Sequence, residues 1–111
     1  MIDRLTDRDA FRRLRAEGRR IRGGPLSLVV RPDPGRGSAA VGFAIPRRVG
    51  NAVTRNRLRR RLRELHRELD REGLLAPGEY LVVAEPSAAE CGYAALRREV
   101  RNLHSRAVSA R

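Results

Sequence analysis

Arginines dominate one short stretch of the 111-residue sequence. Residues 55–63 hold six arginines in nine positions, with Asn56, Leu58 and Leu62 between them. A guanidinium group presents a planar fork of donors that fits phosphate oxygens and can also stack on a nucleobase. This stretch therefore indicates the binding of a polyanion rather than bond-making chemistry.

A helix would place these arginines on one surface. The leucines recur at i, i+4, i+7 and i+11, which puts on one stripe Leu58, Leu62, Leu65 and Leu69. The opposite side then carries Asn56, Arg59, Arg60, Arg63 and Arg67. Within 55–63, only Arg60 and Arg61 have an acid, Glu64, three or four residues away. A solvated face normally mixes both signs, so this one predicts an external anion.

Composition supports the same interpretation. The formal net charge is +12, and all 25 basic residues are arginine, a balance typical of nucleic-acid binding. The length predicts a single domain over residues 1–111. A lone cysteine, Cys91, excludes an internal disulfide, and neither a signal peptide nor a long apolar run is present. We expect a cytoplasmic protein that does not associate with membranes.

The remaining pattern predicts an α/β domain in which helices pack on one small sheet. A first helix over 8–17 has Asp7 or Asp9 as its candidate cap, and the long helix over 51–72 begins at Asn51 and stops at Gly73. Strands are expected at 26–31, 39–45 and 79–84, the first two as an antiparallel pair, with a final helix at 89–107. The passage from 41 to 83 is a candidate parallel crossover, for which the physical default is right-handed.

No catalytic constellation is visible in the sequence. His66 and His104 are solitary, lack metal-ligand spacing and are expected on helix surfaces. Cys91 has no neighbouring base and is expected to be inert, and the carboxylates are scattered. Phe43 is expected in the core. For Phe11, among arginines on a short helix, core packing and base stacking remain equal alternatives.

The sequence from 42 to 64, GFAIPRRVGNAVTRNRLRRRLRE, resembles the signature of the bacterial ribonuclease P protein component. A glycine-led strand, two basic residues, Gly-Asn-Ala-Val and the Arg-Asn-Arg helix all follow that family's order. The resemblance implies a single-domain α-β sandwich with αβββαβα order and a small central sheet. Such a fold is similar to the second domain of ribosomal protein S5 and contains a left-handed βαβ crossover, against the physical default.

The resemblance also implies a function. The chain would be the non-catalytic subunit of a ribonucleoprotein endoribonuclease whose RNA removes the 5′ leader of precursor tRNA, with Mg²⁺ held mainly by that RNA. The expected partners are ribonuclease P RNA and precursor tRNA, and the protein alone is expected to be a monomer. Carried over by position, the RNA-binding residues are Arg47, Arg48, Asn51, Arg55, Asn56, Arg57, Arg59, Arg60 and Arg63. The leader cleft would contain Phe11, Arg15, Leu28 and Val30.

Two positions depart from the family pattern in that cleft. Aromatic residues are common in the family where this sequence has Arg15 and Val29. Stacking on the leader would therefore be weaker, with the Arg15 guanidinium stacking on a base or contacting a phosphate instead. The alternative function is that of a general basic RNA-binding or ribosome-associated protein with no role in tRNA processing.

Overall fold

A computed structural model describes residues 2–5 and 8–109 of the chain. Within these residues the strands are β1 (Ile2–Arg4), β2 (Arg19–Arg22), β3 (Leu26–Pro32), β4 (Ala39–Ala44) and β5 (Gly78–Ala84). The helices are α1 (Arg8–Glu17), α2 (Ala52–Arg71) and α3 (Tyr93–Ser109). Short 3-10 turns are found at η1 (Pro34–Arg36), η2 (Arg47–Val49) and η3 (Pro86–Glu90). No helix in the described part of the chain has the length and apolar character needed to cross a membrane.

The strands form one mixed sheet in the order β1-β4-β5-β3-β2. The central strand β5 runs parallel to β4 and antiparallel to β3. At one edge β1 runs parallel to β4, and at the other β2 runs antiparallel to β3. The β4–α2–β5 passage is therefore a crossover between parallel neighbours, as the sequence suggested.

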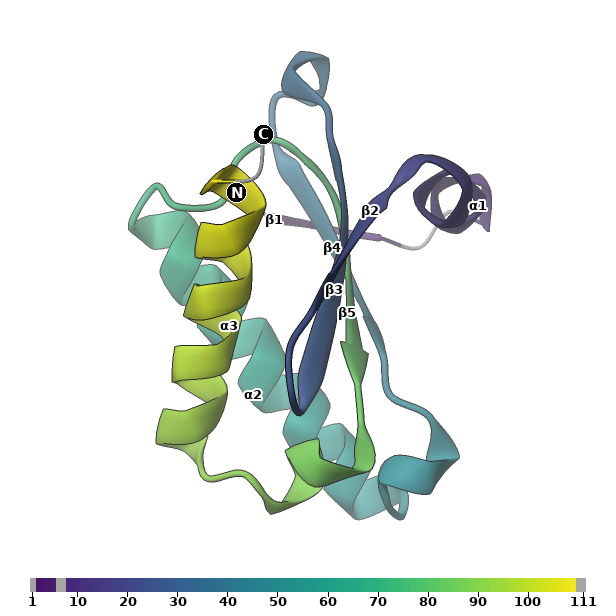
Figure 1. The fold of residues 1–111 in the computed structure, drawn as a ribbon, viewed down its shortest axis with the longest axis vertical. Coiled ribbons are helices and arrows are strands. Elements are labelled where there is room, and N and C mark those ends of the chain that lie inside the picture. Colours follow the sequence, from purple (N-terminus) through teal and green to yellow (C-terminus); the bar gives the residue numbers. More distant parts are fainter. Residues whose placement is uncertain (1, 6–7, 110–111) are drawn as a thin grey trace.

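Helices cover both faces of the sheet, α2 and α3 on one side and α1 on the other (Figure 1). Side chains alternate along each strand, so neighbouring residues point to opposite faces. Leu28, Val30 and Val82 join the larger core under α2 and α3. Val29 and Leu81 join a smaller core under α1, with Leu14.

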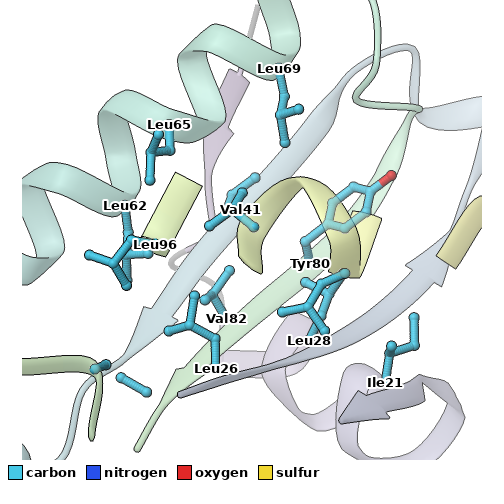
Figure 2. Packing of buried hydrophobic residues seen from close by; sticks show 14 of the residues in the cluster. Ile21, Leu26, Leu28, Val41, Leu62, Leu65, Leu69, Tyr80, Val82 and Leu96 are labelled. Atoms are coloured by element: carbon cyan, nitrogen blue, oxygen red, sulfur yellow. The ribbon is translucent and has the colours of Figure 1, made fainter. Parts of the chain in front are cut away.

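The leucine stripe of α2 packs as its spacing predicts. All four leucines, Leu58, Leu62, Leu65 and Leu69, are buried. Figure 2 shows three of them, Leu62, Leu65 and Leu69, pointing from the helix toward the sheet that carries Val41. Burial of a leucine side chain contributes about 1.5–3 kcal/mol, so this stripe fixes which side of the helix faces solvent.

Local signals set the two ends of α2. The Thr54 amide donates to Asn51 Oδ1 at 2.9 Å, which confirms Asn51 as the N-cap. Beyond the last turn, Gly73 has φ +72°, the left-handed conformation that glycine adopts without a steric penalty. The bounds predicted for this helix, 51–72, are confirmed to within one residue.

Other expectations need correction. The strands predicted at 26–31 and 39–45 run in opposite directions as expected, but they are not paired with each other, because β5 lies between them. The final helix begins at Tyr93 rather than at 89, since η3 occupies the preceding residues. The αβββαβα order holds from α1 onward, and β1 precedes it. Asp7, one candidate cap of α1, lies outside the described residues.

Candidate nucleic-acid interface

The basic face of α2 and the turn before it lies on the outside of the molecule. The residues predicted to bind RNA are all exposed or half-buried: Arg47, Arg48, Asn51, Arg55, Asn56, Arg57, Arg59, Arg60 and Arg63. Arg47 and Arg48 belong to η2, and the other seven lie from the N-cap through the third turn of α2. The structure therefore places the predicted set on two consecutive elements, with every member at least partly exposed.

Few of these arginines have their charge offset within the protein. Arg48 pairs with Glu85 at 3.2 Å. Arg55 Nε donates to the Gly50 carbonyl at 3.1 Å, and Arg59 Nη1 donates to Asn56 Oδ1 at 3.0 Å. These two contacts orient the guanidinium groups without neutralising them. Among the described residues no carboxylate forms an ion pair with the arginines of α2 from 55 to 63.

A cavity of about 360 Å³ lies between α1 and the sheet. Its floor is aliphatic, with Val29, Ala44 and Val83 from three neighbouring strands. Arg15 of α1 and Arg20 of β2 line the same cavity, and both residues are exposed. This arrangement suits an anionic, flexible chain that presents flat apolar groups, which is the chemistry of single-stranded RNA.

The leader-cleft residues predicted from sequence do not share one site. Arg15 lines the cavity under α1, but Phe11 lines a different one between the sheet edge and α2. Leu28 and Val30 are buried in the core on the opposite face of the sheet. Their placement in a cleft beside Phe11 is wrong, because the strand alternates and Val29 is the residue on the α1 face.

A larger cavity, of about 480 Å³, lies where β1 ends beside β4 and α2. Phe11 and Phe43 line it from the sheet side, and Arg59, Arg63 and Arg67 line it from the helix. Gly42 lets α1 approach closely here, since a Cβ at this position would lie 3.4 Å from the Phe11 ring and 3.2 Å from Leu5 Cβ. The ring of Phe11 rests against β4 and keeps one side toward the cavity.

A buried carboxylate fixes α1 over the sheet. Glu79 of β5 is 1% exposed, and its two oxygens accept hydrogen bonds from Arg13 of α1 at 2.8 Å and Arg31 of β3 at 3.1 Å. Arg31 also donates to Glu17, at the end of α1, at 3.0 Å. Removing one partner of a buried pair leaves an uncompensated charge, so this network holds the wall of the 360 Å³ cavity in place.

The two histidines are buried, contrary to the surface positions expected from sequence. His66 of α2 is 1% exposed and His104 of α3 is 6% exposed, and their Nε2 atoms are 3.0 Å apart. His66 Nδ1 lies 2.7 Å from the Leu62 carbonyl, which can only accept, so Nδ1 carries the proton. In the neutral pair, His104 Nε2–H then donates to His66 Nε2.

Burial keeps this pair uncharged. It lowers the pKa of His66 from 6.5 to about 4, partly opposed by the hydrogen bond to Leu62. Burial, with the neighbouring His66 charge second, lowers the pKa of His104 to about 3. The sequence signal for this pair was weak, because each histidine is alone in its own helix and only the packing of α2 on α3 brings them together.

The remaining predicted positions are as follows. Phe43 is half-buried against the main core and makes an edge-on contact with His66, the ring centroids 5.5 Å apart. Cys91 is half-buried, and its Sγ donates to the Ser87 carbonyl at 3.4 Å. Among the described contacts, neither Phe43 nor Cys91 has a neighbouring group that would make it reactive.

The fold and this surface define a class of protein: a small, strongly basic α/β domain whose exposed helix suits a polyanion. The family model described as Ribonuclease P matches residues 2–108. The chain belongs to the ribonuclease P protein family. Membership of this family implies an RNA partner, the ribonuclease P RNA.

Similar proteins agree with this assignment. A "Ribonuclease P protein component" of Roseiflexus sp. (strain RS-1) is 38% identical over 106 residues, covering 94% of this chain and 84% of the relative. A protein of the same name from Thermus aquaticus is 43% identical over 91 residues, covering 82% of this chain. The aligned part spans 51% of that Thermus protein, so the chain matches about half of its length.

Solved structures show the same fold. The RNase P protein of Staphylococcus aureus superposes with a TM-score of 0.83 at 19% identity, covering 94% of each chain. The RNase P protein of Thermotoga maritima gives a TM-score of 0.80 at 24% identity, covering 94% of this chain and 96% of its own. At these identities the likeness speaks for the fold, and it supports the α/β sandwich predicted from sequence.

Proposed function

We propose that this chain is the protein subunit of a ribonuclease P that removes the 5′ leader from precursor tRNA. The observation that carries the proposal is the arginine surface of α2, defined by residues 55–63, which has no carboxylate partner among the described residues. In this proposal the surface binds the catalytic RNA. The family match and the names of the similar proteins support the proposal.

The contribution of the protein to cleavage is electrostatic. Two polyanions, the catalytic RNA and the precursor tRNA, repel each other when they meet, and the net charge of +12 offsets that repulsion. Each phosphate neutralised by an arginine releases counterions, which adds roughly 0.7–0.9 to the slope of log affinity against log salt. The protein therefore acts by binding and orienting RNA.

The cavity between α1 and the sheet is the place we assign to the leader. Its aliphatic floor, including Val29 and Ala44, accepts the flat faces of bases, and Arg15 and Arg20 in its lining bind phosphates. Because none of the described residues lining this cavity is aromatic, contacts to phosphates outweigh stacking. Such contacts carry no base identity, so the site tolerates leaders of different sequence.

The carboxylates that the structure describes do not gather into a Mg²⁺ site. Glu79 accepts from Arg13 and Arg31, and Glu72 accepts from Arg101. Within residues 2–5 and 8–109, no three acidic, histidine or cysteine side chains gather as a metal site. We propose that the Mg²⁺ of the reaction is held by the RNA partner.

Reconstituted cleavage tests the proposed function. Purified protein is mixed with a bacterial ribonuclease P RNA and a precursor tRNA, at a Mg²⁺ concentration where the RNA alone is slow. We expect the protein to accelerate cleavage at the mature 5′ end, and the double variant Arg55→Ala/Arg59→Ala to lose that acceleration. Arg98→Ala, an exposed arginine on α3, is the matched control and should retain it. A protein that binds both RNAs without changing the rate would be a general RNA-binding protein instead.

A further inference from the structure

Apolar packing alone holds α1 on the sheet only weakly. The helix has 10 residues, and isolated helices shorter than about 12–15 residues are marginal in water. It lies on the opposite face of the sheet from α2 and α3 (Figure 1). Of its own residues, only Ala10 and Leu14 are buried. The position of α1 therefore depends on further contacts that link it to the sheet.

The buried carboxylate of Glu79 supplies such a link. Glu79 and Arg31 are directly opposite each other on β5 and β3, and one Glu79 oxygen accepts from Arg31 at 3.1 Å. The other oxygen accepts from Arg13 of α1 at 2.8 Å. The Glu79 side chain is 2% exposed, whereas that of Arg13 is 43% exposed. An arginine at the surface of α1 is thus anchored to a carboxylate beneath the helix.

The same helix contributes to both of the larger cavities. Phe11 lines the 480 Å³ cavity and Arg15 lines the 360 Å³ cavity. Arg13 lies between them in sequence, and it is not among the residues that line either cavity. A shift of α1 would move Phe11 and Arg15 together. Any effect of Arg13 on a strand bound beside α1 would therefore pass through the position of the helix.

The charge of Arg13 is offset within the protein, unlike that of its neighbour. Arg13 pairs with Glu79 on the sheet. Arg12 has a side chain that is 76% exposed and lies 3.8 Å from Asp9 of the same helix. An ion pair within α1 does not link the helix to the sheet. Removal of Arg13 should therefore release α1 without the loss of a phosphate contact.

We propose that the Arg13–Glu79 ion pair is a positioning contact that holds α1 where the leader binds. This inference rests on the proposed function. A molecule in which α1 has left the sheet lacks the leader site, so the apparent affinity for the leader falls with the fraction of molecules in which α1 is docked. The catalytic RNA binds to α2 on the other face, and its affinity does not depend on this pair.

Binding of precursor tRNA to the complex of protein and catalytic RNA, with and without the leader, tests the inference. The gain in affinity due to the leader is compared between wild type, Arg13→Met and Arg12→Met. Both variants remove one charge from α1 and keep an apolar stem, so Arg12→Met is the matched control. We expect Arg13→Met to lose about tenfold of the gain and Arg12→Met to lose less than about twofold. Arg13→Lys should recover most of the loss, because an ammonium group can still pair with Glu79.

Two further measurements distinguish the position of α1 from the charge of Arg13. The slope of log affinity against log salt for the precursor should stay unchanged in Arg13→Met. In Arg15→Ala, which loses a proposed phosphate contact, the slope should fall by roughly 0.7–0.9. Amide hydrogen exchange of the protein without RNA should become faster in α1 of Arg13→Met and stay unchanged in α2.

The outcomes separate this inference from the function on which it rests. If the leader adds no affinity in the wild-type complex, the proposed leader site fails, whereas hydrogen exchange still reports whether the pair holds α1. If the leader adds equal affinity in wild type and Arg13→Met, the positioning role is wrong. Equal losses in Arg12→Met and Arg13→Met, or a lower salt slope in Arg13→Met, would assign Arg13 to the RNA contacts. Faster exchange in α2 as well, or weaker binding of the catalytic RNA, would show that the pair serves the whole fold and would also overturn the inference.

Discussion

The two halves of α2 carry similar charged residues in different surroundings. In the first half, from 52 to 63, the arginines point outward, and no described carboxylate forms an ion pair with them. In the second half, Glu68 pairs with Arg97 at 3.0 Å, and Glu72 pairs with Arg101 at 2.7 Å. The first half is left available for an external polyanion, whereas the second half is tied to α3.

The His66–His104 pair strengthens the same contrast. It lies in the second half of α2, where it links the helix to α3 through buried ring nitrogens. At the end of the same half, hydrogen bonding from Arg101 lowers the pKa of Glu72, and the same bond raises the pKa of Arg101. Positive charge alone does not distinguish the two halves; among the described residues, the ion pairs of Glu68 and Glu72 with α3 do.

The largest expected effect comes from breaking the buried pair. His104→Ala removes a ring from the core and leaves His66 Nε2 without its donor, so we expect a loss of about 2–4 kcal/mol in the free energy of unfolding. Urea denaturation at pH 7.5 measures it. Because the pair belongs to the second half, the affinity of the folded variant for the catalytic RNA should remain unchanged. A stable variant with weakened RNA binding would contradict the division.

Lowering the pH should destabilise the fold through the same histidine pair. Both histidines bind fewer protons in the folded state than in the unfolded state, because their pKa values fall from 6.5 to about 4 and about 3. Their stabilising contribution is therefore complete above pH 6.5 and is lost as the pH falls toward 4. For His66 alone the loss amounts to roughly 3 kcal/mol. Denaturation curves at pH 7.5 and pH 5 should diverge for the wild type and converge for His66→Phe/His104→Phe.

A substitution in the first half of α2 should weaken RNA binding and leave the stability of the fold nearly unchanged. Arg59→Ala is expected to lower the affinity for the catalytic RNA about tenfold, with the free energy of unfolding changed by less than about 0.5 kcal/mol. Filter binding at fixed salt and urea denaturation measure the two quantities. A loss of stability as large as the loss of binding energy would mean that Arg59 serves the fold.

The smallest effect is expected at the surface ion pairs of the second half. Glu72→Gln weakens the contact with Arg101, an exposed pair of a kind worth about 0–1 kcal/mol. Thermal unfolding at low and high salt should show a small difference that high salt removes. RNA affinity should not fall, and a fall would place Glu72 in the interface.

Periodicity and local signals predicted much of this fold. The leucine stripe, the Asn51 cap and the Gly73 stop act within α2 itself, so its bounds and its exposed face could be read from the sequence. The edge strands β1 and β2 could not, because three or four residues rich in charge carry too little alternation. Pairing of β3 with β5 rather than β4 is a long-range choice that no local pattern encodes.

The site divides in the same way. The residues of 47–63 that we propose to bind RNA are close together in sequence and therefore lie together once the helix forms. The cavities are assembled from distant elements, so sequence placed Leu28 and Val30 on the wrong face and grouped Phe11 with Arg15. The His66–His104 contact joins residues 38 positions apart and depends entirely on how α2 packs against α3.

The central claim is that the arginines of α2 from 55 to 63 bind the catalytic RNA, whereas the ion pairs that join Glu68 and Glu72 to α3 take no part in binding. The most direct test is the slope of log affinity against log salt for that RNA, measured for wild type, Arg55→Ala/Arg59→Ala and Arg97→Ala/Arg101→Ala. We expect the first double variant to lower the slope by roughly 1.4–1.8, which corresponds to the loss of two phosphate contacts. The second double variant should leave the slope unchanged. Equal reductions in both variants would contradict the account.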